Sequence, residues 1–321
     1  MTRRDTRADL ALAGAAFLFG TTFLVVQDAV EEGGAIPFLV ARFGIGALVL
    51  LPLAMRRGRP APGFTKAVLV LGGLLGTGYV LQTVGLQDTT SSVSAFITYL
   101  LVVIVPILSA VVLRVSPSPL ALVGVGLAVV GLVLLTAGAG GGALDTGLGR
   151  GELLTLGCAV AFAAHIVALA ADAPRFDVVQ LNLGQFSVVA VVLFVPGFFA
   201  GGYELSGGTF LAAVYTGVVV SAVAFGLQVW GQRQVSATRT ALVLLLEPVF
   251  AAVLGFVAGE RLGVLGALGA GVILVAILVS EVGGPRLTRR SEGCSDEGAG
   301  QSVTASSSAP LTDRSGSAIV G

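Results

Sequence analysis

Long apolar segments recur along the whole chain, and they constrain its fold more than any motif does. A helix of about 20 apolar residues crosses the ~30 Å hydrocarbon core of a membrane. Ten such segments lie at residues 10–29, 35–54, 66–86, 92–113, 119–138, 151–171, 177–199, 208–230, 236–258 and 262–282. They are continuous and too long for the short alternating strands of a membrane barrel. The sequence therefore predicts an all-α polytopic membrane protein with ten transmembrane helices.

The scarcity of charge supports this class and excludes others. Charged residues make up only 11% of the 321 residues, against about 25% in a typical soluble domain. The chain has no basic face for nucleic acid, so the lipid bilayer is the expected partner and nucleic acid is not. The two cysteines, Cys158 and Cys294, and the single histidine show no spacing typical of a metal site or a disulfide framework. We expect neither a metal nor a cofactor.

Lys and Arg fall unevenly on the two sides of the predicted membrane. With the N-terminus in the cytoplasm, Arg150 and Arg261 lie outside, Arg42 lies within a span, and the rest of the 18 lie on the cytoplasmic side. Cytoplasmic loops are enriched in Lys and Arg, so we expect a multi-pass protein of the cytoplasmic membrane with both termini in the cytoplasm. Residues 1–9 form the cytoplasmic N-terminus in this scheme. Residues 283–321 form a Gly/Ser/Thr-rich tail that we expect to be disordered.

The two halves of the chain resemble each other at a nearly constant offset in the sequence. Ala15–Gly20 resembles Val160–Ala163, and Pro106 pairs with Pro248 at almost the same offset. The glycine-spaced runs that start at Gly124 and Gly266 share the offset of the prolines. Because each half holds five spans, the second half must cross the membrane in the opposite sense. Two inverted five-helix repeats are typical of secondary transporters, whose binding sites lie near the midplane between the repeats.

A series of short motifs, taken in order, resembles one family of transporters. The motifs are Leu18–Phe23, Ala41–Phe43, Tyr79–Leu86, Thr89–Thr98 and Pro106, then Gly151–Leu154, Ala224–Phe225, Ser236–Arg239, Leu246–Val249 and Gly259–Arg261. The chain is similar to the EamA family of the drug/metabolite transporter superfamily. The resemblance implies two EamA domains, at residues 10–138 and 151–282, and export of small metabolites or drugs.

Polar residues inside the spans are the candidates for a substrate pathway, because ionisable groups in a membrane normally face the bundle interior. The candidates are Thr22, Arg42, Tyr79, Gln82, Thr98, Tyr99, His165, Gln228 and Glu247. Arg42 either attracts an anionic substrate group or pairs with a carboxylate, or else it orders its helix by bonding backbone carbonyls. His165 is either a coupling group that titrates near neutral pH or a histidine held in place by a hydrogen bond.

Glu247 and the two prolines mark the fourth and ninth spans. Glu247 lies near the middle of its span and is followed by Pro248. A proline leaves the carbonyl four residues earlier without its helical partner, so Pro106 and Pro248 are candidate helix kinks. A carboxylate beside a kink is a candidate proton site, which makes protons a second candidate partner after a small-molecule substrate. The alternative for Glu247 is a structural ion pair, for which Arg239 is the candidate.

These patterns together predict a secondary transporter that exports a small organic metabolite or drug, amino-acid-like or xenobiotic, by alternating access. The alternative is a structural or sensory membrane protein without transport, and a water-accessible cavity between the halves distinguishes the two. The oligomeric state is left open. An enzyme is not favoured, because the sequence has no metal-ligand cluster, no intramembrane aspartate pair and no nucleophile motif. ATP-driven pumping by this chain is not favoured either, because it has no phosphate-binding loop.

Overall fold

The chain folds as helices throughout the part that the structure describes. The computed structural model describes residues 3–22, 25–26, 34–89, 91–138, 149–200, 202–257 and 263–282, and no strand occurs among them. The helices are α1 (Arg3–Gly20), α3 (Ala35–Met55), α4 (Phe64–Gly85), α5 (Ser91–Tyr99), α6 (Leu101–Val112), α7 (Pro119–Gly138), α8 (Arg150–Asp172), α9 (Val178–Phe199), α10 (Gly207–Tyr215), η1 (Thr216–Ala224), α11 (Phe225–Gln232), α12 (Ala237–Leu244), α13 (Leu246–Val257) and α14 (Val264–Val282). The expected tail and the Gly259–Arg261 motif lie outside these residues.

Seven helical segments among the described residues are long and apolar enough to cross a membrane. They are Ala35–Met55, Phe64–Gly85, Ser94–Val112, Arg150–Asp172, Val178–Phe199, Gly207–Gln232 and Ala237–Leu254. Two shorter apolar helices, Pro119–Leu135 and Val264–Val279, correspond to the expected fifth and tenth spans. The expected first span, 10–29, is described continuously only as far as residue 22, and α1 begins among charged residues. The structure thus supports a polytopic helical membrane protein, and the count of ten spans stays a prediction.

Two of the expected spans are each interrupted by a single turn residue, whose backbone angles stay in the right-handed helical region. Leu100 separates α5 from α6, and its N–H donates to the Ile97 carbonyl at 3.1 Å. Leu245 separates α12 from α13 in the same way. Pro248 follows its break closely, whereas Pro106 lies farther from the other break and inside α6. The interruption thus lies near the proline in the second half and more than a turn before it in the first.

A third expected span, 208–230, contains a π-helix. η1 connects α10 to α11 and packs against α3. A Cβ atom added to Gly46 of α3 would lie 2.9 Å from the Cβ of Ser221, and one added to Gly217 of η1 would lie 2.8 Å from the Arg42 carbonyl oxygen. Glycine therefore allows the two backbones to approach closely here.

Three helices begin directly after a polar residue whose side chain caps the first turn. Asp177 caps α9 by accepting the N–H groups of Val179 and Gln180, at 3.0 and 3.2 Å. Ser206 caps α10 and Ser236 caps α12 in the same manner. These side chains satisfy backbone donors that a helix leaves unpaired at its first turn.

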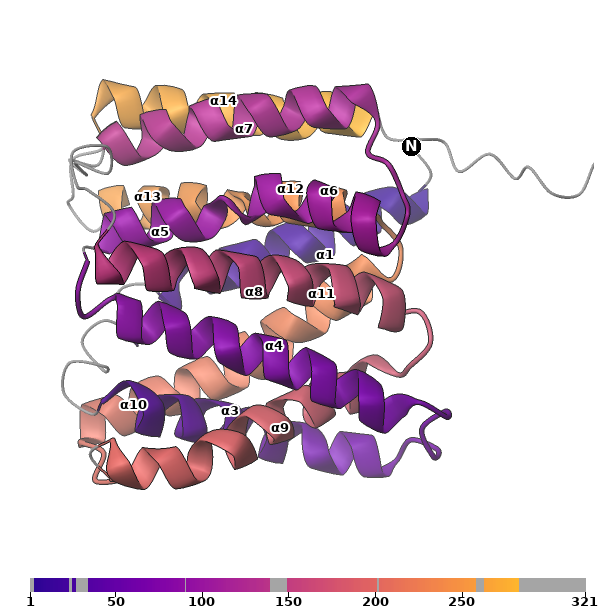
Figure 1. Ribbon diagram of the computed structural model, residues 1–321, viewed down its shortest axis with the longest axis vertical. Coiled ribbons are helices and arrows are strands. Elements are labelled where there is room, and N and C mark those ends of the chain that lie inside the picture. The colour runs from indigo at the N-terminus through magenta and orange to yellow at the C-terminus, as the bar shows by residue number, and fades with distance from the viewer. Residues whose placement is uncertain are drawn as a thin grey trace, which may run out of the picture. The chain divides into compact units, whose positions relative to one another are not determined.

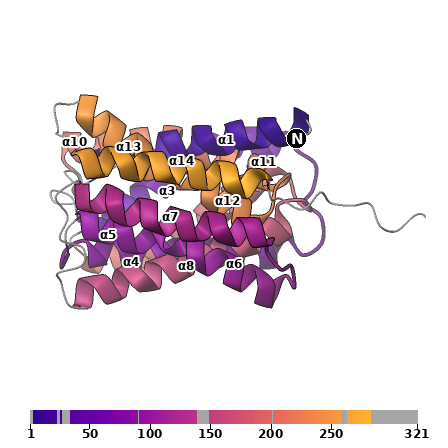
Figure 2. The same ribbon diagram turned by 90° about the horizontal axis from the view of Figure 1, so that it is seen from above.

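The helices run side by side across Figure 1, and their neighbours come from opposite halves of the chain. α7 packs along α14, α3 along α9, α4 along α8 and α9, and α1 along α11, α12 and α13. Figure 2 also shows α14 beside α7. Every strong pairing in this set thus joins a helix from before residue 139 to one from after residue 148.

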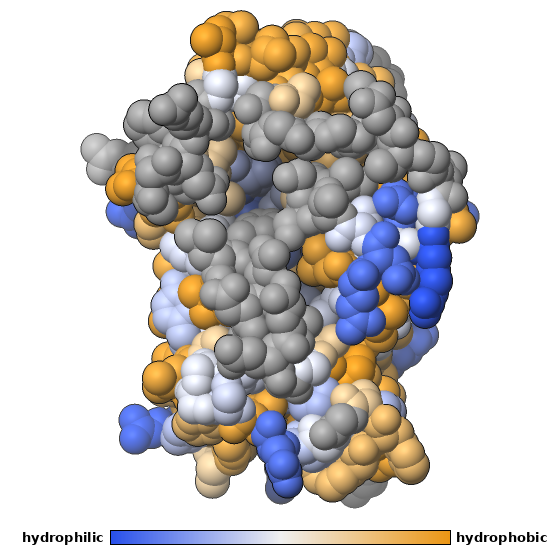
Figure 3. Space-filling view, turned by 90° about the vertical axis from the view of Figure 1, so that its left-hand side faces the viewer, coloured by the Kyte–Doolittle hydropathy of each residue, from blue (hydrophilic) through white to orange (hydrophobic). Residues whose placement is uncertain are grey.

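The two ends of the helices differ in their charged contacts. We call the end at which α1 begins the basic end; there Arg57 lies 3.9 Å from Asp177, and Asp9 forms an ion pair with Arg239. The far end is the one at which α4 ends and α8 begins, and there Arg150 lies 3.3 Å from Asp88. Figure 3 looks at the far end and shows hydrophilic side chains next to apolar ones.

Candidate functional site

A cavity of about 830 Å³ lies between helices of both halves. All nine candidate pathway residues contribute to its lining: Thr22, Arg42, Tyr79, Gln82, Thr98, Tyr99, His165, Gln228 and Glu247. Neither Pro106 nor Pro248 is among the lining residues. The side chains come from α1, α3, α4, α5, α8, α11 and α13, so the folded bundle brings together residues that are far apart in the sequence.

The cavity extends to one end of the helices only. Its lining reaches the far end at Gly34, Gln87 and Thr89. Toward the basic end the lining stops at Ile166 and Gln228. One turn beyond Gln228, the side-chain amide of Gln232 donates to the Ile166 carbonyl at 2.8 Å and ties α11 to α8.

Arg42 presents a buried positive charge to this cavity. Its side chain is only 3% exposed, and it donates to the hydroxyls of Tyr79 at 3.1 Å and Ser221 at 3.3 Å. The guanidinium carbon lies 4.7 Å from the centre of the Tyr79 ring, within the range of a cation–π contact. None of the four ion pairs among the described residues includes Arg42. Among the described residues, the guanidinium is held by two hydroxyls and an aromatic ring.

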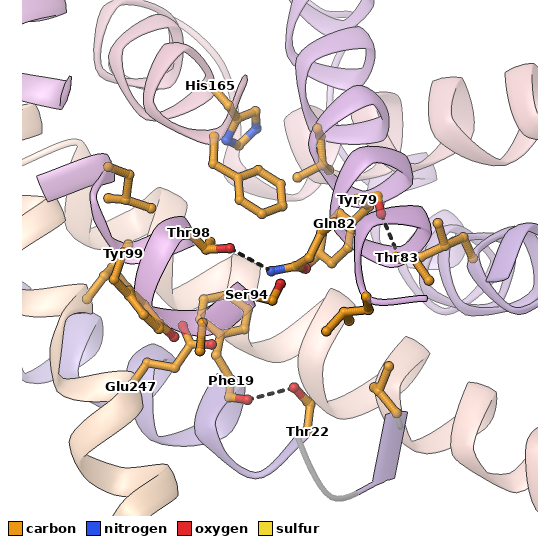
Figure 4. Close-up of a pocket in the computed structure, with 18 of the residues that line it drawn as sticks. Phe19, Thr22, Tyr79, Gln82, Thr83, Ser94, Thr98, Tyr99, His165 and Glu247 are labelled. Atoms are coloured by element: carbon orange, nitrogen blue, oxygen red, sulfur yellow. Dashed lines mark hydrogen bonds between the residues drawn. The ribbon is translucent and has the colours of Figure 1, made fainter. Parts of the chain in front are cut away.

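Glu247 lies on the other side of the same cavity, in the first turn of α13 directly after the break at Leu245. Its carboxylate lies beside the Tyr99 hydroxyl, as Figure 4 shows. Arg239, the structural partner considered from the sequence, forms its ion pair with Asp9 of α1. The cavity thus carries one guanidinium and one carboxylate on different helices.

His165 is held by a chain of buried amides. Its ring is 2% exposed, and its Nε2 lies 2.8 Å from Oε1 of Gln185 on α9. Because an amide oxygen only accepts, the ring N–H donates in this bond. Gln185 donates onward to Asn182 at 2.6 Å. Gln185 and Asn182 were not among the residues predicted from the sequence.

The wall between Arg42 and Glu247 is polar. Gln82 donates to the Thr98 hydroxyl at 3.4 Å, and the Ser94 hydroxyl lies between them and the Glu247 side of the cavity in Figure 4. The hydroxyl of Thr22 donates to the Phe19 carbonyl at 2.7 Å. Ser94 belongs to the Thr/Ser-rich segment from residue 89 to residue 98, which was the sequence signal for this wall.

Six aromatic side chains form a continuous row through the bundle. Neighbouring ring centres are 5.1 to 5.5 Å apart along Phe162, Tyr79, Phe43, Phe186, Phe225 and Phe19. The two central rings, Phe43 and Phe186, are fully buried, and the other four line the cavity. Four of the five ring contacts are edge-to-face and the central one is tilted, and aromatic pairs in such arrangements attract one another.

In the described part of the chain, no group of three or more His, Cys, Asp and Glu side chains could hold a metal ion. The cavity lining combines hydroxyls, amides, an imidazole, aromatic rings and two opposite charges with aliphatic side chains such as Leu39, Leu75 and Leu244. Long apolar helices around such a cavity define a multi-pass membrane protein with an internal polar site.

Comparison with known proteins identifies the family. The sequence model of the EamA-like transporter family matches residues 6–137 and 149–281. An uncharacterized transporter of Archaeoglobus fulgidus is 31% identical over 275 residues, which cover 85% of each chain. A WAT1-related chloroplast protein of Arabidopsis thaliana is 27% identical over 279 residues, covering 81% of this chain and 66% of that protein. The chain therefore belongs to the EamA-like transporter family.

The fold also has a solved counterpart. One crystal structure superimposes with a TM-score of 0.73 at 20% identity, covering 86% of this chain and 97% of the other. At this identity the likeness concerns the fold alone. Membership of a transporter family implies a small-molecule substrate and a lipid environment for this chain.

Proposed function

We propose that this protein is a secondary transporter that exports a small organic metabolite or drug across the cytoplasmic membrane by alternating access. The observation that carries the proposal is the 830 Å³ cavity, which presents charged and polar side chains among apolar ones inside an apolar bundle and reaches only one end of the helices. A volume of this size suits a small organic solute. A purely structural protein has no need of a cavity of this kind, and the family match favours transport over a sensory role.

Alternating access requires two halves that can exchange conformations, and the aromatic row supports such halves. Phe19 and Phe162 are separated by the same length of chain as Phe43 and Phe186, and Tyr79 and Phe225 by nearly the same length. If each residue of the row is exchanged for its counterpart in the other half, the order of the row is reversed and the same neighbours remain in contact. Phe43 and Phe186 are themselves counterparts, and they touch at its centre.

The helix pairings show the same correspondence between the two halves. Under the offset that relates Phe43 to Phe186, α1 corresponds to α8 and α4 to the segment that ends in α11. The contact of α4 with α8 then becomes the contact of α1 with α11, and both are present. The pairs α3–α9 and α7–α14 map onto themselves. These relations support two inverted five-helix repeats, residues 10–138 and 151–282, whose rearrangement would close the far end and open the basic end.

The Lys and Arg pattern supports the proposed orientation. Cationic residues collect at the basic end, and the positive-inside rule places that end in the cytoplasm. Both termini are then cytoplasmic, and the cavity faces the outside in this conformation. In an exporter this is the conformation from which the solute is released.

We also propose that transport is coupled to protons through Glu247. The carboxylate lies at the cavity beside Tyr99, and Arg42 and Tyr79 are the other ionisable groups close enough to affect it. His165 is the second candidate for proton coupling, and its Nε2–H already donates a hydrogen bond to Gln185. A carboxylate that faces both the solute and water can take up a proton in one conformation and release it in the other.

An export screen with an overexpressing strain, followed by uptake into everted membrane vesicles, tests the proposal. Amino acids and cationic dyes are the probes, because they represent the two predicted substrate classes. Thr98→Trp places an indole in the cavity, and we expect it to abolish transport. Val191→Trp adds the same group to a side chain that is 72% exposed on α9, and transport should persist. Equal transport by vesicles with and without the protein, for every probe, would refute the function.

A further inference from the structure

Two uncharged polar side chains lie buried behind the wall of the cavity without contributing to it. Gln185 is 0% exposed and Asn182 is 1% exposed, both on α9. Among the described residues, a hydrogen bond connects Gln185 to His165, which lines the cavity. Burying amides inside a membrane bundle costs free energy unless they are hydrogen-bonded, and Gln185 bonds both Asn182 and His165 here.

The position of Gln185 in the second half is the position of Arg42 in the first. The two residues immediately precede the counterparts Phe186 and Phe43. Their helices, α3 and α9, pack against each other. Thr22 and His165 are separated by the same length of chain and are a further pair of counterparts. In this conformation Arg42 faces the cavity and Gln185 does not.

If the halves exchange conformations, the counterparts exchange surroundings. We propose that Gln185 and Asn182 form a second polar subsite of the transport path, which the solute reaches only when the bundle is open at the basic end. The subsite would bind a hydrogen-bond acceptor such as a carboxylate through the two amide NH₂ groups. The inference rests on the proposed alternating access and adds the residues that the solute meets in the opposite conformation.

The two subsites differ in charge. Arg42 offers a permanently charged planar guanidinium, which suits a carboxylate. Gln185 and Asn182 offer neutral donors, whose hydrogen bonds to an anion are weaker because only one partner is charged. The same group of the solute would therefore be bound by a cation in one conformation and by amides in the other.

Reaching Gln185 requires the contacts at the basic end to separate. Gln232 joins α11 to the Ile166 carbonyl of α8 at 2.8 Å, within the second half. The ion pair between Asp9 and Arg239 joins α1 to α12 across the two halves, and its side chains are only 13% and 19% exposed. Together these contacts hold the bundle closed at this end.

Cysteine accessibility tests the subsite without knowledge of the natural solute. The full chain, with Cys158 and Cys294 replaced by Ala and Ser, carries one new cysteine at a time. A membrane-impermeant maleimide is applied to right-side-out and to inside-out vesicles. We expect Leu39→Cys, which lines the cavity and is the counterpart of Asn182, to react from the far-end face and Gln185→Cys to react from the other face, each about tenfold faster than from the opposite side.

Three further variants control the experiment. Val189→Cys lies one turn from Gln185 and is 1% exposed; its counterpart Gly46 does not line the cavity, so it should be protected from both faces. Asp9→Asn removes the ion pair at the basic end and should raise the reactivity of Gln185→Cys about fivefold. Asn182→Cys reports on the same subsite if the loss of Gln185 disturbs His165.

The outcomes separate the two proposals. If Leu39→Cys reacts from one face only, while the cysteines at 182 and 185 are protected from both faces even with Asp9→Asn, the second subsite is refuted. The same conclusion follows if they react from the face that labels Leu39→Cys. If Leu39→Cys reacts equally from both faces, the cavity is an open pore and the alternating-access function itself is refuted.

Discussion

Replacing Arg42 by Gln is the sharpest test of what the cavity binds. The guanidinium has no carboxylate partner among the ion pairs of the described residues, so its charge is available to a bound solute. A hydrogen bond to a charged group contributes about 1.5–3 kcal/mol. Losing that contribution should weaken the binding of a carboxylate-bearing solute about 10–100-fold.

The expected effect on stability is small, and the structure explains why. Arg42→Gln loses charge-assisted bonds to the hydroxyls of Tyr79 and Ser221, each of about 1.5–3 kcal/mol. The same change removes a buried cation that forms no ion pair with a described carboxylate, which offsets that loss. The midpoint of thermal unfolding in detergent should therefore change by no more than about 4 °C. Arg42→Lys retains the charge without the planar fork and should bind with intermediate affinity.

The assay is uptake into proteoliposomes of each carboxylate-bearing solute that the export screen returns, alongside its primary amide. For Arg42→Gln we expect KM to rise for the acid and to change little for the amide. An equal loss for both compounds would show that Arg42 acts only by ordering its helix. A screen that returns only solutes without an anionic group would also contradict the argument.

The remaining predictions concern coupling, capping and packing. Glu247→Gln should remove the pH dependence of transport, because the amide cannot exchange a proton beside Tyr99; an unchanged pH profile in vesicles would exclude Glu247 as the coupling group. Asp177→Ala should lower the free energy of unfolding by about 1 kcal/mol through loss of the cap of α9, measured by thermal unfolding, with Asp177→Asn as a control that retains an acceptor. Gly72→Ala should force α4 away from α9, because the added Cβ would lie 2.6 Å from the Cβ of Val188; a Tm equal to that of the unmodified protein would contradict the close packing.

The sequence located the cavity residues better than the shape of the helices around them. All nine candidate pathway residues line one cavity, because a polar side chain in an apolar span is stabilised only by facing the interior. Gln185 and Asn182 could not be predicted in this way. They lie near the start of the expected span 177–199, where a polar residue is compatible with the membrane surface. The offset between the halves, applied to Arg42, was the signal that points to Gln185.

The positions at which the helices are interrupted could not be predicted as well from the sequence. Pro106 predicts a missing hydrogen bond at one position, yet α6 continues through it and the break lies at Leu100. The π-helix η1 has no proline, and its only sequence signal is the small residues, such as Gly217, that allow α3 to approach. Where a helix bends depends on which neighbouring helix packs there, and no local pattern records that neighbour.

The placement of Arg42 and Glu247 on different helices of one cavity has an electrical consequence. When both are ionised their charges cancel, so an uncharged or zwitterionic solute adds nothing for the membrane potential to act on. A proton on Glu247 leaves the guanidinium uncompensated, and each unit charge carried through the full field responds by about 2.3 kcal/mol per 100 mV. A monoanionic solute restores neutrality beside Arg42. The protonation state of Glu247 thus determines whether the membrane potential affects the transport of a monoanion.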